Sequence, residues 1–262
     1  MVTAGVGPSS HPYHRFGNGE QPLLILPGVT DGSGWWTDPS WLTATALAQY
    51  YFRGYQKYDV WVVARPPGSA SADSREMAAG YADMLETLGP AHILGISLGG
   101  VIGAHLATET DLVDRLVLVS CGVGLGSFGR QTVARWAEYA ATGRYRELHL
   151  DYIQQVYAGR RRLVMPLCYR LGAHWLPEPA VPGDVVRSGE AMLAYDGRIL
   201  PEVSVPTLVV GGRDDPLVPV ASHREAARRL DCTLAVASGG HAVYEESRRG
   251  VTSVVTSFLD GG

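Results

Sequence analysis

The stretch HILGISLGGVIGAHLA, residues 92–107, decides how the rest of the chain is interpreted. An apolar run leads straight into Gly95-Ile96-Ser97-Leu98-Gly99, and a segment with helical spacing of apolar residues follows. A strand, a sharp turn and a helix in this order form a nucleophile elbow, which strains the serine backbone and lifts its hydroxyl clear of the sheet. Glycines flank the serine because side chains at those positions would collide with neighbouring backbone. The stretch therefore predicts Ser97 as a nucleophile, against the simpler interpretation of a plain strand-to-helix turn.

Similar apolar runs recur along the chain and alternate with helical segments. Each run is continuous rather than alternating, which is typical of strands buried on both faces. The clearest helix extends from about Asp73, a capping residue with Glu76 three positions later, to Leu88, where Gly89 ends it. We therefore expect an α/β protein with a mostly parallel central sheet and helices on both faces. Functional residues in such proteins gather at the carboxyl ends of the strands. The runs cover residues 22–28, 59–68, 91–97, 115–121, 206–212 and 232–238.

One interval, residues 122–200, lacks a convincing buried strand but contains several helix-like segments. It is too long for a simple crossover between strands, and a structureless loop of that length inside a compact protein would be unusual. We predict a helical insertion, or cap, over 122–200, within a core formed by residues 1–121 and 201–262.

The composition is that of a globular protein and gives no general basis for binding nucleic acid. Of the 262 residues 46% are apolar and 18% charged, with a net charge of −4. Three distant cysteines, Cys121, Cys168 and Cys232, favour neither a disulfide framework nor a thiolate metal site. The sequence starts without a signal-peptide pattern and contains no apolar run long enough to cross a bilayer. We expect a cytoplasmic protein without a membrane span, metal or cofactor; the oligomeric state stays open.

A serine hydroxyl needs a base, and the base needs an acid to orient it. His241, in ASGGHAVYEE (237–246), follows the last apolar run and two glycines. Candidate acids are Asp214 and Asp215, in GGRDDPLVP (211–219). Neighbouring extended residues point to opposite sides, so only one can face His241, and the following proline favours an extended Asp215. His223 falls in an amphipathic helical pattern, and we expect it to face solvent.

With these motifs in the order serine, acid, histidine, the chain from about Leu23 resembles the α/β-hydrolase superfamily, in its branch with a serine nucleophile and a helical cap. That resemblance implies that Asp215 is the acid, because the family pattern G-x-x-D-x-x-[VI]-P falls on it. It also implies an oxyanion hole formed by the backbone N–H groups of Leu98 and Val29. Relatives usually carry His-Gly where this chain has Pro27-Gly28. In the loop that follows, Thr30, Trp35 and Trp36 would line the substrate pocket or simply pack beneath it.

A serine at the nucleophile position argues against haloalkane dehalogenases and epoxide hydrolases of this fold, which use aspartate. The resemblance implies a carboxylesterase that cleaves a small or medium ester through an acyl-enzyme on Ser97. Alternatives are acyl transfer, perhydrolysis or carbon–carbon bond hydrolysis with the same triad, or a non-catalytic protein that binds a small ligand. A G-x-G-x-x-G pattern at 124–129 would suit a nicotinamide cofactor. No strand with a terminal acid follows it at the required distance, so we expect no cofactor.

Overall fold

The computed structural model describes residues 2–29, 31, 45–46, 48–172, 179 and 181–261. Its strands are β1 (Thr3–Val6), β2 (Pro12–Gly17), β3 (Pro22–Leu26), β4 (Asp59–Val63), β5 (Ala91–Ile96), β6 (Val113–Val119), β7 (Thr207–Gly212) and β8 (Thr233–Ala237). Its α-helices are α2 (Ser74–Leu88), α3 (Leu98–Glu109), α4 (Ser127–Ala141), α5 (Tyr145–Val156), α6 (Arg161–Gly172), α7 (Pro182–Ala194), α8 (Val220–Arg229), α9 (Val243–Glu246) and α10 (Arg248–Leu259). Shorter helical turns are η1 (Pro8–Ser10), η3 (Ala48–Phe52), η4 (Arg53–Tyr55) and η6 (Leu200–Glu202).

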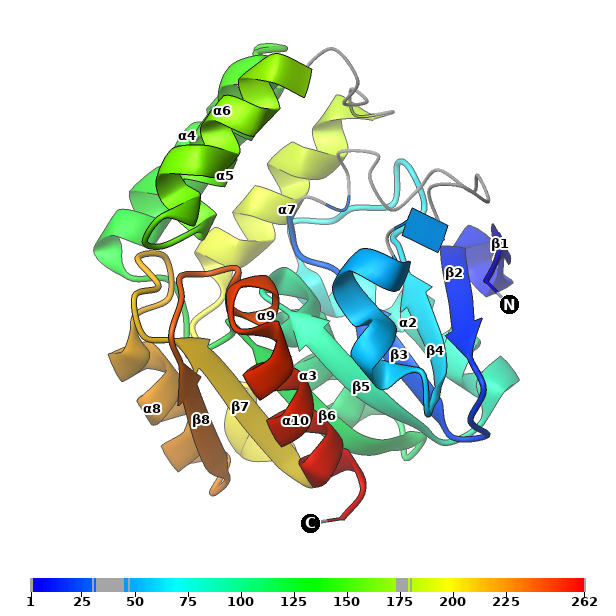
Figure 1. Ribbon diagram of the computed structural model, residues 1–262. Coiled ribbons are helices and arrows are strands. Elements are labelled where there is room, and N and C mark those ends of the chain that lie inside the picture. Colours follow the sequence, from blue (N-terminus) through cyan, green and yellow to red (C-terminus); the bar gives the residue numbers. More distant parts are fainter. Residues whose placement is uncertain are drawn as a thin grey trace.

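The strands form one eight-stranded sheet in the order β1-β2-β4-β3-β5-β6-β7-β8. From β4 to β8 every neighbouring pair is parallel, whereas β2 pairs with β4, and β1 with β2, in the antiparallel sense. Helices cover both faces of this sheet (Figure 1). The prediction of a mostly parallel α/β sheet is confirmed, and the carboxyl ends of the parallel strands meet along one edge.

Successive residues of the central strands feed two separate cores, one on each face of the sheet. In β3, Leu24 and Leu26 join the core under α2 and α3, while Leu23 and Ile25 join the core under α10 and η4. Because side chains alternate across a strand, a strand covered on both faces needs apolar residues at every position. This requirement explains the continuous apolar runs of the sequence.

Helix α2 shows how local residues set an element's limits. Asp73 caps it, accepting a hydrogen bond from the Arg75 amide at 2.8 Å, and Gly89 ends it with a φ of 81°. The expected contribution of Glu76 to the cap is not observed, because its carboxylate instead accepts a hydrogen bond from the Ser71 hydroxyl at 2.6 Å.

The interval predicted as an insertion contains α4–α7, and its described residues include no strand. These helices lie above the carboxyl edge of the sheet (Figure 1). Asp184 of α7 connects them to the loop after β4, because its buried carboxylate accepts a hydrogen bond from the Gly68 amide at 2.7 Å. We refer to residues 122–200 as the helical insertion; its status as a separate domain stays a prediction.

The expected position of His223 is wrong. The imidazole is 0% exposed and packs on β7, where a side chain at Gly211 would place its Cβ 2.6 Å from His223 Nδ1.

The described part of the chain contains no helix that is both long and apolar enough to cross a membrane.

Candidate active site

Ser97 occupies a strained turn between β5 and α3. Its φ of 53° and ψ of −117° lie in a region that side chains rarely adopt. The turn is tight because its neighbours are glycines: a Cβ on Gly95 would lie 2.3 Å from the Gly99 carbonyl oxygen, and one on Gly99 would lie 2.0 Å from the Leu26 oxygen. The expected strand–turn–helix geometry is therefore present, and it requires the glycines of the sequence pattern.

His241 and Asp215 meet Ser97 from two other strand ends. The Ser97 Oγ lies 3.0 Å from His241 Nε2, and His241 Nδ1 lies 2.8 Å from Asp215 Oδ2. All three residues are buried, between 5% and 7% exposed. Asp214, the other candidate acid, is exposed. The structure thus joins the serine, the histidine and the second aspartate into one hydrogen-bonded chain.

The Asp215 carboxylate is held in place by backbone. Its Oδ1 accepts hydrogen bonds from the amides of Leu217 at 2.8 Å and Val218 at 3.0 Å. Only Oδ2 therefore faces the imidazole. Since a carboxylate accepts but does not donate, His241 must carry its proton on Nδ1, which leaves Nε2 free to accept the Ser97 hydroxyl proton.

The loop after β3 lies against the serine. A Cβ on Gly28 would contact Ser97 Cβ at 3.4 Å and Oγ at 4.0 Å, so glycine allows this backbone to pass close to the Ser97 hydroxyl. Val29 follows Gly28 and lines the cavity beside Ser97. Leu98 is the first residue of α3, where backbone N–H groups lack intrahelical partners. The predicted pocket residues Thr30, Trp35 and Trp36 lie outside the described residues.

A small, mostly apolar cavity opens on Ser97 and His241, with a volume of about 40 Å³. A second cavity of about 10 Å³ shares four of its lining residues and continues it between α4, α5 and α7. Together the two cavities have room for only a few water molecules. The helical insertion supplies the shared residues Val133, Trp136 and Tyr152. Among the described lining residues of both cavities, His241 is the only ionisable group besides tyrosine, and none is Lys or Arg.

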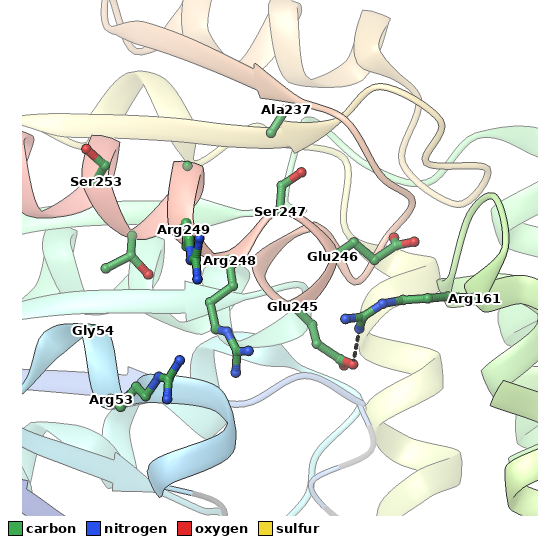
Figure 2. A pocket seen from close by; sticks show the side chains of 12 residues that line it. Arg53, Gly54, Arg161, Ala237, Glu245, Glu246, Ser247, Arg248, Arg249 and Ser253 are labelled. Atoms are coloured by element: carbon green, nitrogen blue, oxygen red, sulfur yellow. Dashed lines mark hydrogen bonds and ion pairs between the residues drawn. The ribbon is translucent and has the colours of Figure 1, made fainter. Parts of the chain in front are cut away.

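The loop that carries His241 is bonded directly to the helical insertion. The Ala242 amide donates to the Val156 carbonyl at 2.9 Å. Glu246 accepts hydrogen bonds from the Gly240 amide at 2.6 Å and from the Ala158 amide at 2.9 Å. Figure 2 shows the neighbouring contact, in which Arg161 of α6 forms an ion pair with Glu245 of α9.

A larger groove of about 660 Å³ lies beside this ion pair, and α10 supplies more of its lining residues than any other element. Figure 2 shows its lining side chains. Neither Ser97 nor His241 lines it, so we place the candidate site at the smaller cavity.

The glycine pattern at 124–129 lies at the start of α4, where the Gly126 amide donates to the Leu217 carbonyl at 2.9 Å. That amide is occupied by protein backbone rather than free for a phosphate.

Two buried residues near the site were not indicated by any sequence motif. Arg65, after β4, is 4% exposed, and Asp31 is 0% exposed. The Arg65 amide donates to Asp31 Oδ2 at 2.6 Å. Burial raises the pKa of Asp31 to about 6, although the neighbouring Arg65 charge lowers it. Only the position of Arg65 just beyond a strand's carboxyl end could have marked it in the sequence.

Comparisons with known proteins identify the family of the chain. The chain is 30% identical over 238 residues to a Stutzerimonas stutzeri protein provisionally named carbamate hydrolase RutD, covering 85% of this chain and 86% of that protein. It is 26% identical over 208 residues to a poly(3-hydroxyalkanoate) depolymerase of Ectopseudomonas oleovorans, covering 74% and 68%. The crystal structure of the enol-lactonase from Burkholderia xenovorans LB400 superposes with a TM-score of 0.77 at 19% identity, covering 97% and 98% of the two chains. The profile of the alpha/beta hydrolase family matches residues 23–254, and the chain belongs to that family.

Proposed function

We propose that this hydrolase is a carboxylesterase that cleaves a small ester through an acyl-enzyme on Ser97. The observation that carries the proposal is the continuous path from Ser97 Oγ through His241 to Asp215, with contacts of 3.0 and 2.8 Å. Such a path provides a nucleophile, a base and an orienting acid in one constellation.

In the proposed reaction, Ser97 Oγ attacks the ester carbonyl carbon while its proton moves to His241 Nε2. The carbonyl oxygen becomes an oxyanion and accepts hydrogen bonds from the backbone N–H groups of Leu98 and Val29. Asp215 stabilises the imidazolium that forms. Collapse of the tetrahedral intermediate breaks the ester C–O bond, and the imidazolium gives its proton to the leaving alcohol. Water, deprotonated by His241, then attacks the acyl-enzyme and releases the carboxylic acid and free Ser97.

The lining of the cavity favours a substrate with a short, uncharged and apolar acyl group. Apart from the hydroxyls and the imidazole, the described side chains that line it are aliphatic, aromatic or the Met192 thioether, and such surfaces favour apolar ligands. No Lys or Arg lines it among the described residues, and the residues outside the described ranges include neither type. A substrate with a carboxylate on its acyl side would therefore find no cation to pair with. The insertion covers Ser97 as a cap would, so a longer chain requires its helices to move.

A panel of p-nitrophenyl esters from acetate to octanoate tests this proposal on the wild type and on Ser97→Ala. We expect kcat/KM to be greatest for the short esters, and we expect kcat of Ser97→Ala to fall by roughly 10⁴–10⁶. A fluorophosphonate should label the wild type and not the variant. Full activity in Ser97→Ala would remove the basis of the assignment.

Relatives named carbamate hydrolase make carbamate cleavage a second candidate. Ser97 would attack the carbamate carbonyl carbon, and the same N–H groups would stabilise the oxyanion. Release of amine and carbon dioxide from a carbamate without a p-nitrophenyl group would reveal this reaction. Product analysis with alcohols and hydrogen peroxide as competing acceptors separates hydrolysis from acyl transfer and perhydrolysis. Hydrolysis of a carbon–carbon bond would instead give a carboxylic acid and a second organic product that is not an alcohol.

A further inference from the structure

Arg65 reaches from the end of β4 to the backbone beside the nucleophile. Its guanidinium Nη2 donates to the Gly28 carbonyl oxygen at 2.9 Å, and its Nε lies 3.7 Å from Asp31 Oδ2. The side chains of both partners are almost fully buried, 4% and 0% exposed. A buried ion pair is weak evidence for stability, because desolvation offsets most of the attraction. The position of the pair therefore calls for another explanation.

The acceptor of that hydrogen bond belongs to a peptide group that the proposed reaction uses. The Gly28 carbonyl and the Val29 N–H form one planar, trans peptide unit, so the two bonds point in opposite directions. A guanidinium that holds the carbonyl oxygen on one side thereby directs the Val29 N–H to the other side. Ser97 lies close to this peptide group: a Cβ on Gly28 would lie 3.4 Å from Ser97 Cβ, and Val29 and Ser97 line the same cavity.

The same contact also changes the strength of the N–H as a donor. A cation bound to the carbonyl oxygen draws electron density through the conjugated amide, so the N–H hydrogen becomes more positive. Hydrogen bonds from an ionised donor are shorter and stronger than neutral ones. The Asp31 amide donates to the same Gly28 oxygen at 3.2 Å, which makes this oxygen doubly held.

We propose that Arg65, buttressed by Asp31, is a positioning residue that aims and polarises the Val29 N–H toward the oxyanion formed at Ser97. The inference rests on the proposed function, since it needs an oxyanion to be stabilised. Arg65 touches no reacting atom; it acts through one peptide group.

A purely structural role makes different predictions. If Arg65 only anchored the loop after β4 to the loop after β3, its removal would lower the fraction of folded enzyme and the unfolding temperature. The remaining folded molecules would bind every ligand as before. If Arg65 aims the donor, folded molecules lose affinity for an oxyanion and retain affinity for a neutral ester.

The test removes both charges together in Arg65→Met/Asp31→Asn, so that no unpaired charge is left buried. The matched control is Arg15→Met/Asp59→Asn, which removes the ion pair of 2.7 Å at the opposite end of β4. For each variant, fluorophosphonate titration counts the reactive sites, and kcat and KM are determined per site. The inhibition constant of an aryl trifluoromethyl ketone, which forms an anionic tetrahedral adduct on serine, is determined with them.

We expect kcat per site of Arg65→Met/Asp31→Asn to fall roughly 10- to 100-fold, which is less than the loss of about 10²–10³ for removing one oxyanion donor outright, because the Val29 N–H is still present. KM should stay within about twofold, and the inhibition constant of the ketone should rise by the same factor as kcat/KM falls. The control should keep kcat, KM and ketone inhibition within about twofold of the wild type.

An unchanged kcat per site, or a fall in kcat without weaker ketone binding, would overturn the role of Arg65. If the double variant does not fold, Arg65→Lys gives the same comparison, because lysine keeps the charge without the planar donor fork. The two proposals fail separately: an active Ser97→Ala enzyme refutes the esterase, whereas an inactive Ser97→Ala beside a fully active Arg65 variant refutes only this inference.

Discussion

Replacement of Asp215 by asparagine isolates the role of a single proton at the candidate site. Because Oδ1 accepts from the Leu217 and Val218 amides, the side-chain oxygen of the asparagine should take that position. Its NH₂ group then faces His241 Nδ1, and a donor there forces Nδ1 to become the acceptor. The proton moves to Nε2, so the imidazole points a hydrogen at Ser97 and cannot accept one.

The magnitude follows from the cost of the alternative rotamer. Turning the amide round would restore the useful histidine tautomer but would oppose the NH₂ group to two backbone N–H donors. Each unsatisfied buried donor costs about 1–3 kcal/mol, so the turned amide is disfavoured by about 2–6 kcal/mol. At about 1.4 kcal/mol for each factor of ten, kcat should fall by roughly 30-fold to about 2 × 10⁴-fold. The upper end of this range agrees with the loss of about 10⁴ when a triad aspartate elsewhere becomes asparagine.

The assay is p-nitrophenyl acetate hydrolysis per fluorophosphonate-reactive site, with circular dichroism and thermal unfolding to establish that the variant folds. Asp214→Asn is the matched control, because that residue is exposed; its kcat should stay within about threefold of the wild type. If Asp215→Asn keeps more than about a tenth of the wild-type kcat, or if Asp214→Asn is the more damaging change, the assignment of the acid is wrong.

Two further changes test the cavity and the buried pair. Gly189→Ala adds a Cβ 3.4 Å from Ala137 Cβ and 3.6 Å from Val133 Cγ1; inside α7 it should stabilise the fold by up to about 1 kcal/mol, seen as a higher unfolding temperature. It should also narrow the inner cavity and lower kcat/KM for octanoate relative to acetate, and a preference for longer chains would contradict this. Burial raises the pKa of Asp31 from 3.8 to about 6. The folded state therefore binds this proton more tightly than the unfolded chain does, so the proton stabilises the fold at low pH, and this stabilisation is lost as the pH rises through 6. In urea unfolding between pH 4 and pH 7, the wild type should lose about 2 kcal/mol of unfolding free energy relative to Arg65→Met/Asp31→Asn, and the opposite trend would refute the buried charge.

The sheet and the elbow could be predicted because their requirements are local. A strand covered on both faces must be apolar throughout, and a serine with a φ of 53° between crowded backbones must have glycine neighbours. That only one of Asp214 and Asp215 can face His241 also followed from local geometry, since adjacent extended residues point to opposite sides; the choice of Asp215 needed the resemblance to the family pattern and the proline that follows it.

Other features depend on contacts between distant segments and left no local pattern. Arg65 and Asp31 are 34 positions apart in the chain, and only the packing of two loops joins them. His223 looked like a surface residue of an amphipathic helix, yet the absence of a side chain at Gly211 gives its imidazole a place against β7. Burial then lowers the pKa of His223 to about 4, although the Asp215 charge opposes the shift.

The joint between α5 and α6 has a consequence for engineering. Val156 and Ala158 are bonded to the segment that carries His241, so this joint helps to hold the candidate base although the chain order assigns it to the insertion. A chimera that exchanges all of residues 122–200 for those of a relative would also exchange the scaffold of its own histidine. A graft that retains residues 156–161 and replaces only α4, the first turns of α5 and α7 should change substrate preference while leaving the proton-transfer path in register.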